Sequence, residues 1–187
     1  MALQVPAIQH YEKYLGLPSF VGRNKKACFT QIKERIWAKM QGWKEKLLSQ
    51  AGKEVMIKAV VQSIPAYSIG VFKLPVGLCK DIEAMISKFW WGSGVSKKIH
   101  WVKWSSLCSS KSIRGMGFRD LQKFNNAMLA KQVWRLIHQK ETLLFKVFSA
   151  KYFRNGCVLD APISPKCSYA WRSILQTRDV INKGAIL

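Results

Sequence analysis

The chain has 187 residues, and its 31 Lys and Arg against 10 Asp and Glu give a formal net charge of +21. Because 49% of the residues are hydrophobic, with eight Trp and nine Phe, the composition excludes an intrinsically disordered polypeptide and is sufficient for a buried core. The charge indicates a polyanionic partner, with nucleic acid first and an anionic membrane surface second.

The N-terminal part of the chain predicts a short hairpin followed by a long amphipathic helix. Residues 11–21 combine Tyr, Leu, Phe and Val with Gly and Pro at their bounds, which is typical of a strand or hairpin arm. Beyond them, apolar residues recur at helical spacing and form one stripe that we expect to be buried: Phe29, Ile32, Ile36, Met40, Trp43 and Leu47. Gly42 lies inside this helix, where it allows a kink.

Capping residues and prolines set the bounds of the two helices that follow. The hydroxyl of Ser49 is placed to cap a second helix, which must end at or before Pro65 because the residue preceding a proline disfavours helical geometry. Pro75 suits the first turn of a third helix, since a proline there loses no helical hydrogen bond, and this helix is expected to end near Gly92.

The C-terminal half is also predicted to be helical. The alternating segment "IHWVKW" (residues 99–104) predicts one short strand, and a long helix is expected to begin near Asp120. Two shorter helices are expected at residues 143–152 and 169–175. The sequence therefore predicts a mainly α fold, a helical bundle with a short N-terminal β-hairpin arm and one or two short strands.

Cations concentrate on and around the first long helix. Arg35, Lys39 and Lys46 fall on one flank of its apolar stripe, where side chains four and seven residues apart can follow a phosphate backbone. The alternative is a solvated face whose Lys stems cover the edge of the core. The concentration of further cations before and after the helix favours nucleic-acid binding, and the residues predicted to bind are Arg23, Lys25, Lys26, Arg35, Lys39, Lys46, Lys53 and Lys58.

Four tryptophans near the middle of the chain allow two interpretations. Trp90, Trp91, Trp101 and Trp104 lie among lysines, and aromatic side chains interleaved with cations can stack on bases. Such tryptophans more often pack into a core while the indole N–H donates to a backbone carbonyl. We favour the core.

Catalytic and metal-binding patterns are weak. The five cysteines are scattered without a C-x-x-C pair, so free thiols are expected and no zinc site. The ten acidic residues show no spacing typical of a two-metal site, and no cofactor is predicted. Residues 55–78 form the most apolar region, but lysines and prolines interrupt it, so no membrane span or membrane partner is expected. We expect a protein without enzymatic activity.

Five blocks of sequence point to a family. They are "YLGLPSFVGRNKKACFTQIKERIWAKMQGWKEKLLSQAGKEVMIKAVVQSIPAY", "KFWWG", "KKIHWVKWSSLC", "GMGFRDLQKFNNAMLAKQVWRL" and "SAKYFRNG". Together they closely resemble the reverse transcriptases of plant non-LTR (LINE-type) retrotransposons, in the part just after the polymerase palm. The resemblance covers nearly the whole chain.

The resemblance implies three regions. Residues 1–22 would be the end of the palm, with Tyr14, Leu15 and Gly16 in a primer-grip-like hairpin. Residues 23–95 would be a basic, thumb-like helical domain that holds the template–primer duplex, and residues 96–187 a helical connection before a zinc-binding module.

The sequence also departs from the family pattern. The catalytic aspartates of the reverse transcriptase would lie upstream, and the zinc-binding module and ribonuclease H domain downstream, so none of them is in this chain. Arg114 stands where the family usually has glycine, and Arg154 where proline is common. These departures indicate a drifting remnant.

Three functional hypotheses remain open. The first is a non-catalytic fragment of a retrotransposon reverse transcriptase that retains sequence-independent affinity for RNA or an RNA/DNA duplex. The second is a subunit that completes a reverse transcriptase by joining a palm supplied in trans. The third is a relic without selected function. Because related elements are nuclear and their fragments occur in plant organellar genomes, the expected compartment is the mitochondrion or the nucleus.

Overall fold

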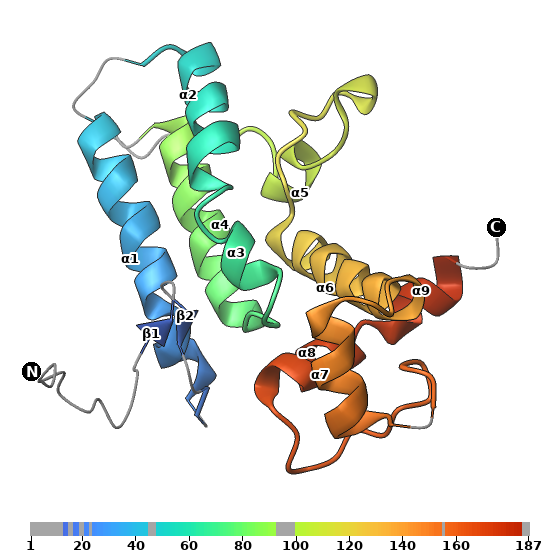
Figure 1. The fold of residues 1–187 in the computed structure, drawn as a ribbon. Coiled ribbons are helices and arrows are strands. Elements are labelled where there is room, and N and C mark those ends of the chain that lie inside the picture. Colours follow the sequence, from blue (N-terminus) through green and yellow to red (C-terminus); the bar gives the residue numbers. More distant parts are fainter. Residues whose placement is uncertain are drawn as a thin grey trace, which may run out of the picture.

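Helices make up most of the chain and surround two hydrophobic cores (Figure 1). The computed structural model describes residues 13–14, 17–18, 21–22, 24–44, 48–92, 100–154 and 156–184. Two short strands, β1 (Lys13–Tyr14) and β2 (Leu17–Pro18), pair antiparallel with Tyr14 opposite Leu17. The helical elements are α1 (Lys25–Lys44), α2 (Gln50–Met56), the π-helical turn η1 (Ile57–Val61), α3 (Ala66–Ile69), α4 (Val76–Trp91), α5 (Trp104–Leu107), the 3₁₀ turn η2 (Lys111–Ile113), α6 (Leu121–His138), α7 (Leu143–Tyr152), α8 (Tyr169–Leu175) and α9 (Arg178–Gly184). The predicted mainly α fold is confirmed.

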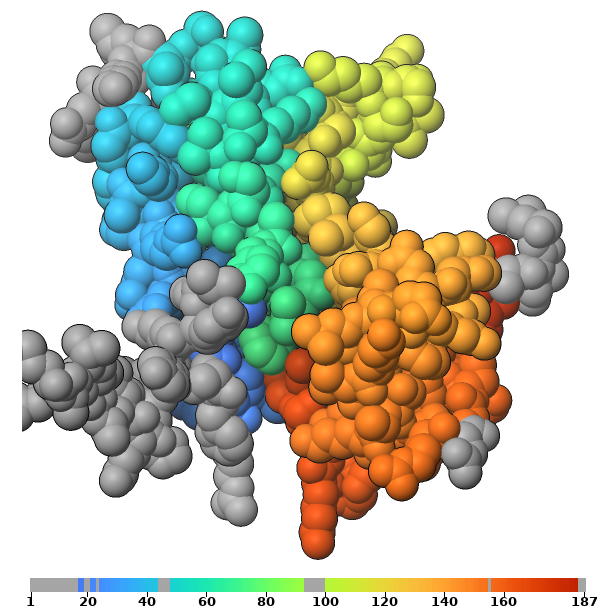
Figure 2. All heavy atoms as spheres, in the orientation of Figure 1, coloured from blue at the N-terminus to red at the C-terminus, as the bar shows by residue number. Residues whose placement is uncertain are grey.

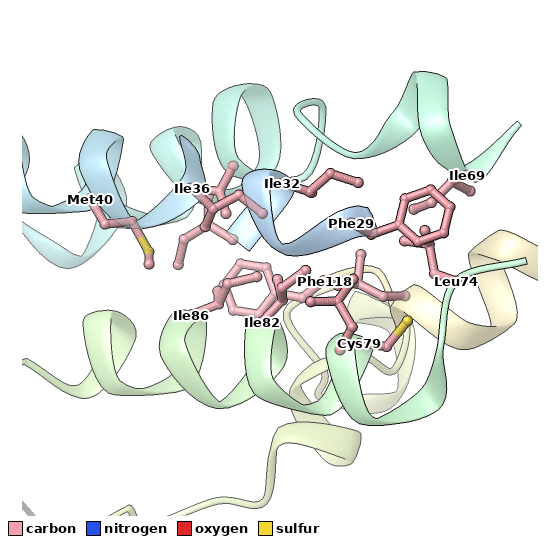
Figure 3. Close-up of a cluster of buried hydrophobic side chains, with 14 of the residues drawn as sticks. Phe29, Ile32, Ile36, Met40, Ile69, Leu74, Cys79, Ile82, Ile86 and Phe118 are labelled. Atoms are coloured by element: carbon pink, nitrogen blue, oxygen red, sulfur yellow. The ribbon is translucent and has the colours of Figure 1, made fainter. Parts of the chain in front are cut away.

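The first core forms where α1 packs on α4. Ile36 of α1 is 0% exposed and points toward Ile82 and Ile86 of α4, which are as deeply buried (Figure 3). Phe29, near the start of α1, is 1% exposed and lies beside Ile69 and Leu74. Burying each such side chain contributes roughly 1.5–3 kcal/mol. The apolar stripe predicted for the first helix is thus the seam that fixes α1, and the helix runs through Gly42 as one element.

Several predicted helix ends are confirmed by their caps. The Ser49 hydroxyl accepts a hydrogen bond from the backbone N–H of Gly52, 3.2 Å away, at the start of α2. The Asp120 carboxylate accepts one from the N–H of Lys123 at 2.9 Å and begins α6. Gly92 ends α4 with φ 91°, a conformation that glycine adopts without strain. The ranges predicted for α7 and α8 match the structure.

The second core forms around α6, α7 and α8. Trp171 is 0% exposed, and its ring stacks on Tyr152 at 4.7 Å and on Phe153 at 5.5 Å between ring centroids. Leu129 and Val133 of α6 complete this core. Because α6 also packs against α4, it joins the two cores, and Figure 2 shows α1–α4 and the orange-to-red C-terminal part as adjoining masses.

Buried Asn125 fixes the junction between α6 and the segment after α3. Its side-chain amide donates to the carbonyls of Ile69 and Phe72 at 2.8 and 2.9 Å, and its side-chain oxygen accepts from the N–H of Leu74 at 2.8 Å. Asn125 is 1% exposed, so these bonds satisfy backbone groups that solvent cannot reach. One polar side chain therefore holds residues 69–74 against α6.

The prediction of a strand at residues 99–104 is wrong for residues 100–104, the part of this segment that the structure describes. Residues 100–103 form no strand, and α5 begins at Trp104. Trp101 is 76% exposed, so the prediction that it packs into a core is also wrong. An alternating pattern predicts a strand only where a neighbouring strand can pair with it, and within the described ranges this segment has none.

The other tryptophans mostly follow the core interpretation. Trp90 is 7% exposed and meets Phe118 edge-on, while the ring of Trp104 stacks on the same Phe118 at 5.2 Å. The expected indole hydrogen bonds are absent for Trp91 and Trp104, whose buried N–H groups have no partner among the described residues.

Two further observations concern the helices. No sequence pattern predicted α9, which spans Arg178–Gly184. No helix within the described ranges is long and apolar enough to cross a membrane.

Arg114 has the left-handed conformation at the end of η2, with φ 63°. A side chain in this region costs roughly 1–2 kcal/mol, which is why glycine is favoured there. The next residue, Gly115, leaves no space for a side chain, since an added Cβ would lie 2.0 Å from the Ser109 carbonyl oxygen. The backbone conformation at position 114 is therefore one that favours glycine over arginine.

Candidate nucleic-acid interface

One flank of α1 carries exposed cations. Arg35 and Lys39 are one helical turn apart, both are exposed, and neither forms an ion pair or hydrogen bond with another described residue. The buried stripe beside them holds the backbone of α1 on α4, so the two charges stand on a fixed scaffold. This is the arrangement that the sequence predicted for contact with a phosphate backbone.

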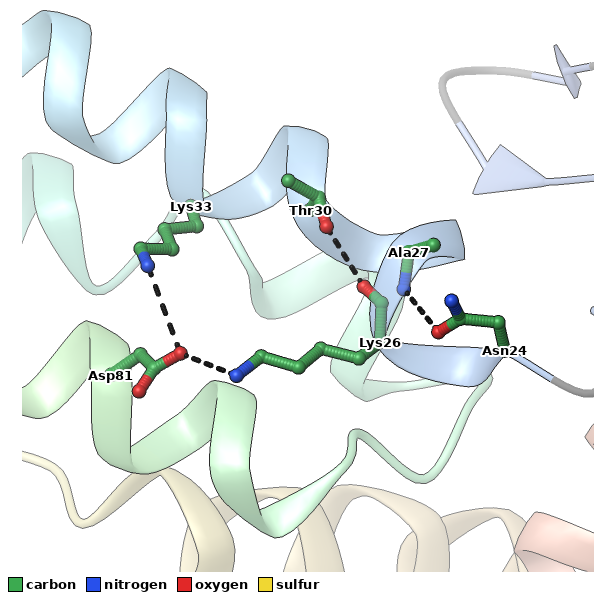
Figure 4. Close-up of polar contacts among 6 residues, drawn as sticks. All are labelled: Asn24, Lys26, Ala27, Thr30, Lys33 and Asp81. Atoms are coloured by element: carbon green, nitrogen blue, oxygen red, sulfur yellow. Dashed lines mark hydrogen bonds and ion pairs between the residues drawn. The ribbon is translucent and has the colours of Figure 1, made fainter.

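The opposite flank of α1 is engaged within the protein. The ammonium of Lys26 lies 2.9 Å from Oδ2 of Asp81 on α4, and that of Lys33 lies 3.7 Å from the same oxygen (Figure 4). The hydrogen bond from Lys26 lowers the pKa of Asp81. Asn24 caps the helix by accepting from the N–H of Ala27 at 3.1 Å. The charge of Lys26, one of the predicted binding residues, is therefore compensated.

Lys58 is engaged as well. Its ammonium lies 2.7 Å from the Glu54 carboxylate, which also pairs with Lys111 at 2.8 Å, and 5.7 Å from the centroid of the Phe118 ring. The hydrogen bonds from Lys111 and Lys58 lower the pKa of Glu54. Lys53, in the last turn of α2, is half-buried. These two lysines stand on α2 and η1 rather than on the edge with Arg35.

Some predicted residues fall outside the described part of the chain. Arg23 and Lys46 do so among the cations, and Leu15 and Gly16 do so in the primer-grip-like hairpin. Tyr14 is in β1, opposite Leu17, whose side chain is 8% exposed and belongs to the first core. The hairpin is thus attached to the helical body through Leu17.

A cleft that no sequence pattern predicted lies near the start of α1. It has a volume of about 750 Å³, and its walls include Lys25 together with Lys166, Tyr169 and Arg172, which come from the segment leading into α8 and from α8 itself. The ammonium of Lys25 lies 5.1 Å from the Tyr169 ring centroid. These residues are more than 140 positions apart and share no helical stripe, so no local pattern could bring them together.

Most of the described acidic side chains serve as helix caps or ion-pair partners, namely Glu54, Asp81, Glu83, Asp120 and Glu141. Glu83 accepts a hydrogen bond from the N–H of Leu121 at 2.8 Å, and burial raises its pKa, with the nearby charge of Asp120 acting in the same direction. Both carboxylates therefore stabilise the start of α6. In the part of the chain that the structure describes, no group of three or more His, Cys, Asp or Glu side chains could hold a metal ion.

These features define a basic, mainly helical protein with exposed cations along one edge of its longest described helix. The chain belongs to the family of an uncharacterized mitochondrial protein of Arabidopsis thaliana, to which it is 41% identical over 126 residues, or 66% of this chain and 82% of that protein. It is also 38% identical to a putative ribonuclease H protein of A. thaliana over 173 residues. That match covers 90% of this chain but 28% of the relative. No family model and no solved structure matches the chain.

Proposed function

We propose that the protein is a retrotransposon-related, non-catalytic nucleic-acid-binding protein that corresponds to the thumb region of a LINE-type reverse transcriptase. The observation that carries the proposal is the pair of exposed, unpaired cations, Arg35 and Lys39, on a helix fixed by a buried seam. A net charge of +21 supports a polyanionic partner, and contacts to phosphates alone carry no sequence information. The ligand is therefore RNA or an RNA/DNA duplex, bound without sequence preference.

The relatives support an origin in a larger element. The putative ribonuclease H protein contains the matched region as 28% of its length, and the other relative is mitochondrial by its name. We place the protein in the mitochondrion on this ground. Imaging of a fluorescent fusion in plant cells tests this assignment, and a purely nuclear signal would contradict it.

Binding is tested by fluorescence anisotropy with labelled RNA and RNA/DNA duplexes of two unrelated sequences. We expect dissociation constants in the micromolar range or weaker, nearly equal for the two sequences. Affinity should fall steeply between about 50 and 200 mM salt, because phosphate neutralisation releases counterions. An affinity that is unchanged over this range would contradict the proposal.

The lack of catalysis is tested by primer extension. Purified protein with Mg²⁺, a primer–template and nucleotides should extend nothing. Most of the described carboxylates cap helices or pair with lysines, and none belongs to a group of three potential metal ligands among the described residues. Extension above a buffer blank that disappears on mutation of one acidic residue would identify an enzyme instead.

A second candidate function is that of a subunit acting in trans. It is favoured by the match to 28% of the length of a longer relative, in which this region is joined to further polypeptide. Purified chain added to a reverse transcriptase that lacks the corresponding region should then restore extension. No restoration at saturating concentrations would leave the binding protein as the proposed function.

A further inference from the structure

The cleft at the start of α1 has a positively charged mouth. Lys25, Lys166 and Arg172 line it, and none of the three pairs with a carboxylate within the described residues. The Arg172 guanidinium donates to the Pro165 carbonyl at 3.0 Å, but its Nε is buried and has no hydrogen-bond partner there. A half-buried cation without a counter-charge favours an anion beside it.

The cleft also has an aromatic wall, beside the Lys25 ammonium. Phe72 stacks on Tyr169 with ring centroids 5.9 Å apart, and the Tyr169 hydroxyl donates to the Lys73 carbonyl. Burial raises the pKa of Tyr169, so its side chain is neutral. The cleft thus combines three cations with a fixed apolar wall, and its volume of about 750 Å³ falls in the range of pockets that hold small organic molecules.

We propose that this cleft binds one unpaired nucleotide of a nucleic-acid strand. The three cations hold its phosphate, and its base lies against the wall formed by Phe72 and Tyr169. Bases of a duplex are paired and stacked, so only a single-stranded segment can place a base in the cleft. The inference rests on the proposed function and adds a preference for single strands to it.

The cleft and the exposed edge of α1 are close enough for one strand to contact both. From Lys25 to Arg35 the helix rises about 15 Å, at about 1.5 Å per residue. A strand stacked as in a duplex rises about 3.4 Å per nucleotide and an unstacked single strand rises more, so no more than about five nucleotides are needed to span this distance. An oligonucleotide of about eight residues is therefore a suitable probe.

A thiol inside the cleft provides a direct readout. Cys167 lines it, whereas Cys157 is exposed and lies outside it, and both are free thiols. The protein is treated with iodoacetamide at low salt, with and without a saturating single-stranded RNA octamer, and the two alkylation rates are measured by peptide mass spectrometry. We expect the octamer to slow alkylation of Cys167 at least fivefold and to leave Cys157 within twofold of its free rate.

Two further arms separate the possible ligands. The same sequence as a blunt duplex should leave Cys167 unprotected, and adenosine 5′-monophosphate should protect it while adenosine does not. Protection by the duplex equal to that by the single strand would overturn the preference for an unpaired nucleotide. Equal protection by adenosine would overturn the role of the cations.

Variants separate this inference from the proposed function. Lys25→Gln, Lys166→Gln and Arg172→Gln should each reduce protection of Cys167, and circular dichroism checks that each variant folds. Arg35→Gln with Lys39→Gln should weaken overall binding while saturating octamer still protects Cys167. If fluorescence anisotropy shows that the octamer binds but Cys167 is not protected from alkylation, the cleft is not the nucleotide site. The proposed function would then still stand. No binding of any nucleic acid would overturn both.

Discussion

The two flanks of α1 carry the same kind of residue in different electrostatic settings. Lys26 and Lys33 share the Asp81 carboxylate of α4, whereas Arg35 and Lys39 on the other flank have no charged partner in the described chain. A lysine that is already in an ion pair must break that pair before it can contact a phosphate. A cation without a charged partner can contact the phosphate directly. A count of cations thus overstates the proposed binding surface, and we expect the availability of each charge to decide its contribution to binding.

The largest effect on stability is expected from a substitution in the buried stripe of α1 that lies between the two flanks. Ile36→Ala removes a side chain that is 0% exposed and faces α4, so it should lower the free energy of unfolding by about 2–5 kcal/mol. Denaturant titration measures this loss. Ala38→Gly, on an exposed site of the same helix, should cost about 1 kcal/mol and serves as the control. Equal losses for the two variants would show that α1 is not held by this seam.

The next prediction compares the flanks directly. Arg35→Gln with Lys39→Gln should weaken RNA binding and reduce the magnitude of the log–log salt slope by about two units if both side chains contact phosphates. Lys26→Gln with Lys33→Gln removes the same charge from the same helix and should change the slope by less than one unit. Anisotropy at several salt concentrations measures both. Equal changes would show that binding depends on net charge alone.

The sequence predicted the local parts of this comparison and missed the long-range ones. The stripe of α1 and the caps at Ser49 and Asp120 follow from spacing within a few residues. The caps are confirmed, and so is the stripe from Phe29 to Trp43, while its last predicted member, Leu47, lies outside the described residues. The capture of Lys26 by Asp81 depends on how two helices dock, which no local pattern contains. The same holds for Asn125, whose partners lie more than 50 residues away.

The residues of the candidate site were also predictable only where a local sequence pattern places them. Arg35 and Lys39 were predicted from the helical wheel, and the structure leaves them exposed. Lys25 was predicted as part of a basic run, but its place beside Tyr169 and Arg172 requires the chain to return after 140 residues. Trp101 was assigned to a core because tryptophans interleaved with lysines more often pack than stack on bases, yet only the folded chain shows that it is 76% exposed.

A smaller effect is expected from the ion pair on the engaged flank. The folded pKa of Asp81 lies below its ordinary value of 3.8, so its contribution to stability is present above that pH and is lost as pH falls through the folded pKa. Wild type should therefore lose more stability than Asp81→Asn between pH 5 and about 3. Thermal melts over this range measure the difference. Parallel pH profiles would show that the pair contributes nothing.

The smallest effect is expected at Arg114, which ends η2 and has no charged partner among the described residues. The segment after α5 that contains η2 lies apart from α1 (Figure 1). Arg114→Gly relieves the left-handed strain of roughly 1 kcal/mol, and the greater freedom of glycine in the unfolded chain offsets most of it. Denaturant titration should show a gain of a few tenths of a kcal/mol. The RNA salt slope should not change, because the lost charge is away from the binding edge.

The neighbouring residue provides the control for this backbone argument. Gly115→Ala would place a Cβ about 2.0 Å from the Ser109 carbonyl, so the turn must shift and the variant should be clearly destabilised. If Arg114→Gly destabilises the protein as much as Gly115→Ala does, the effect of residue 114 on stability comes from its guanidinium group and not from its backbone conformation. If instead Arg114→Gly lowers the salt slope as much as the Arg35 and Lys39 double variant, every unpaired cation binds phosphate and the edge of α1 has no special role.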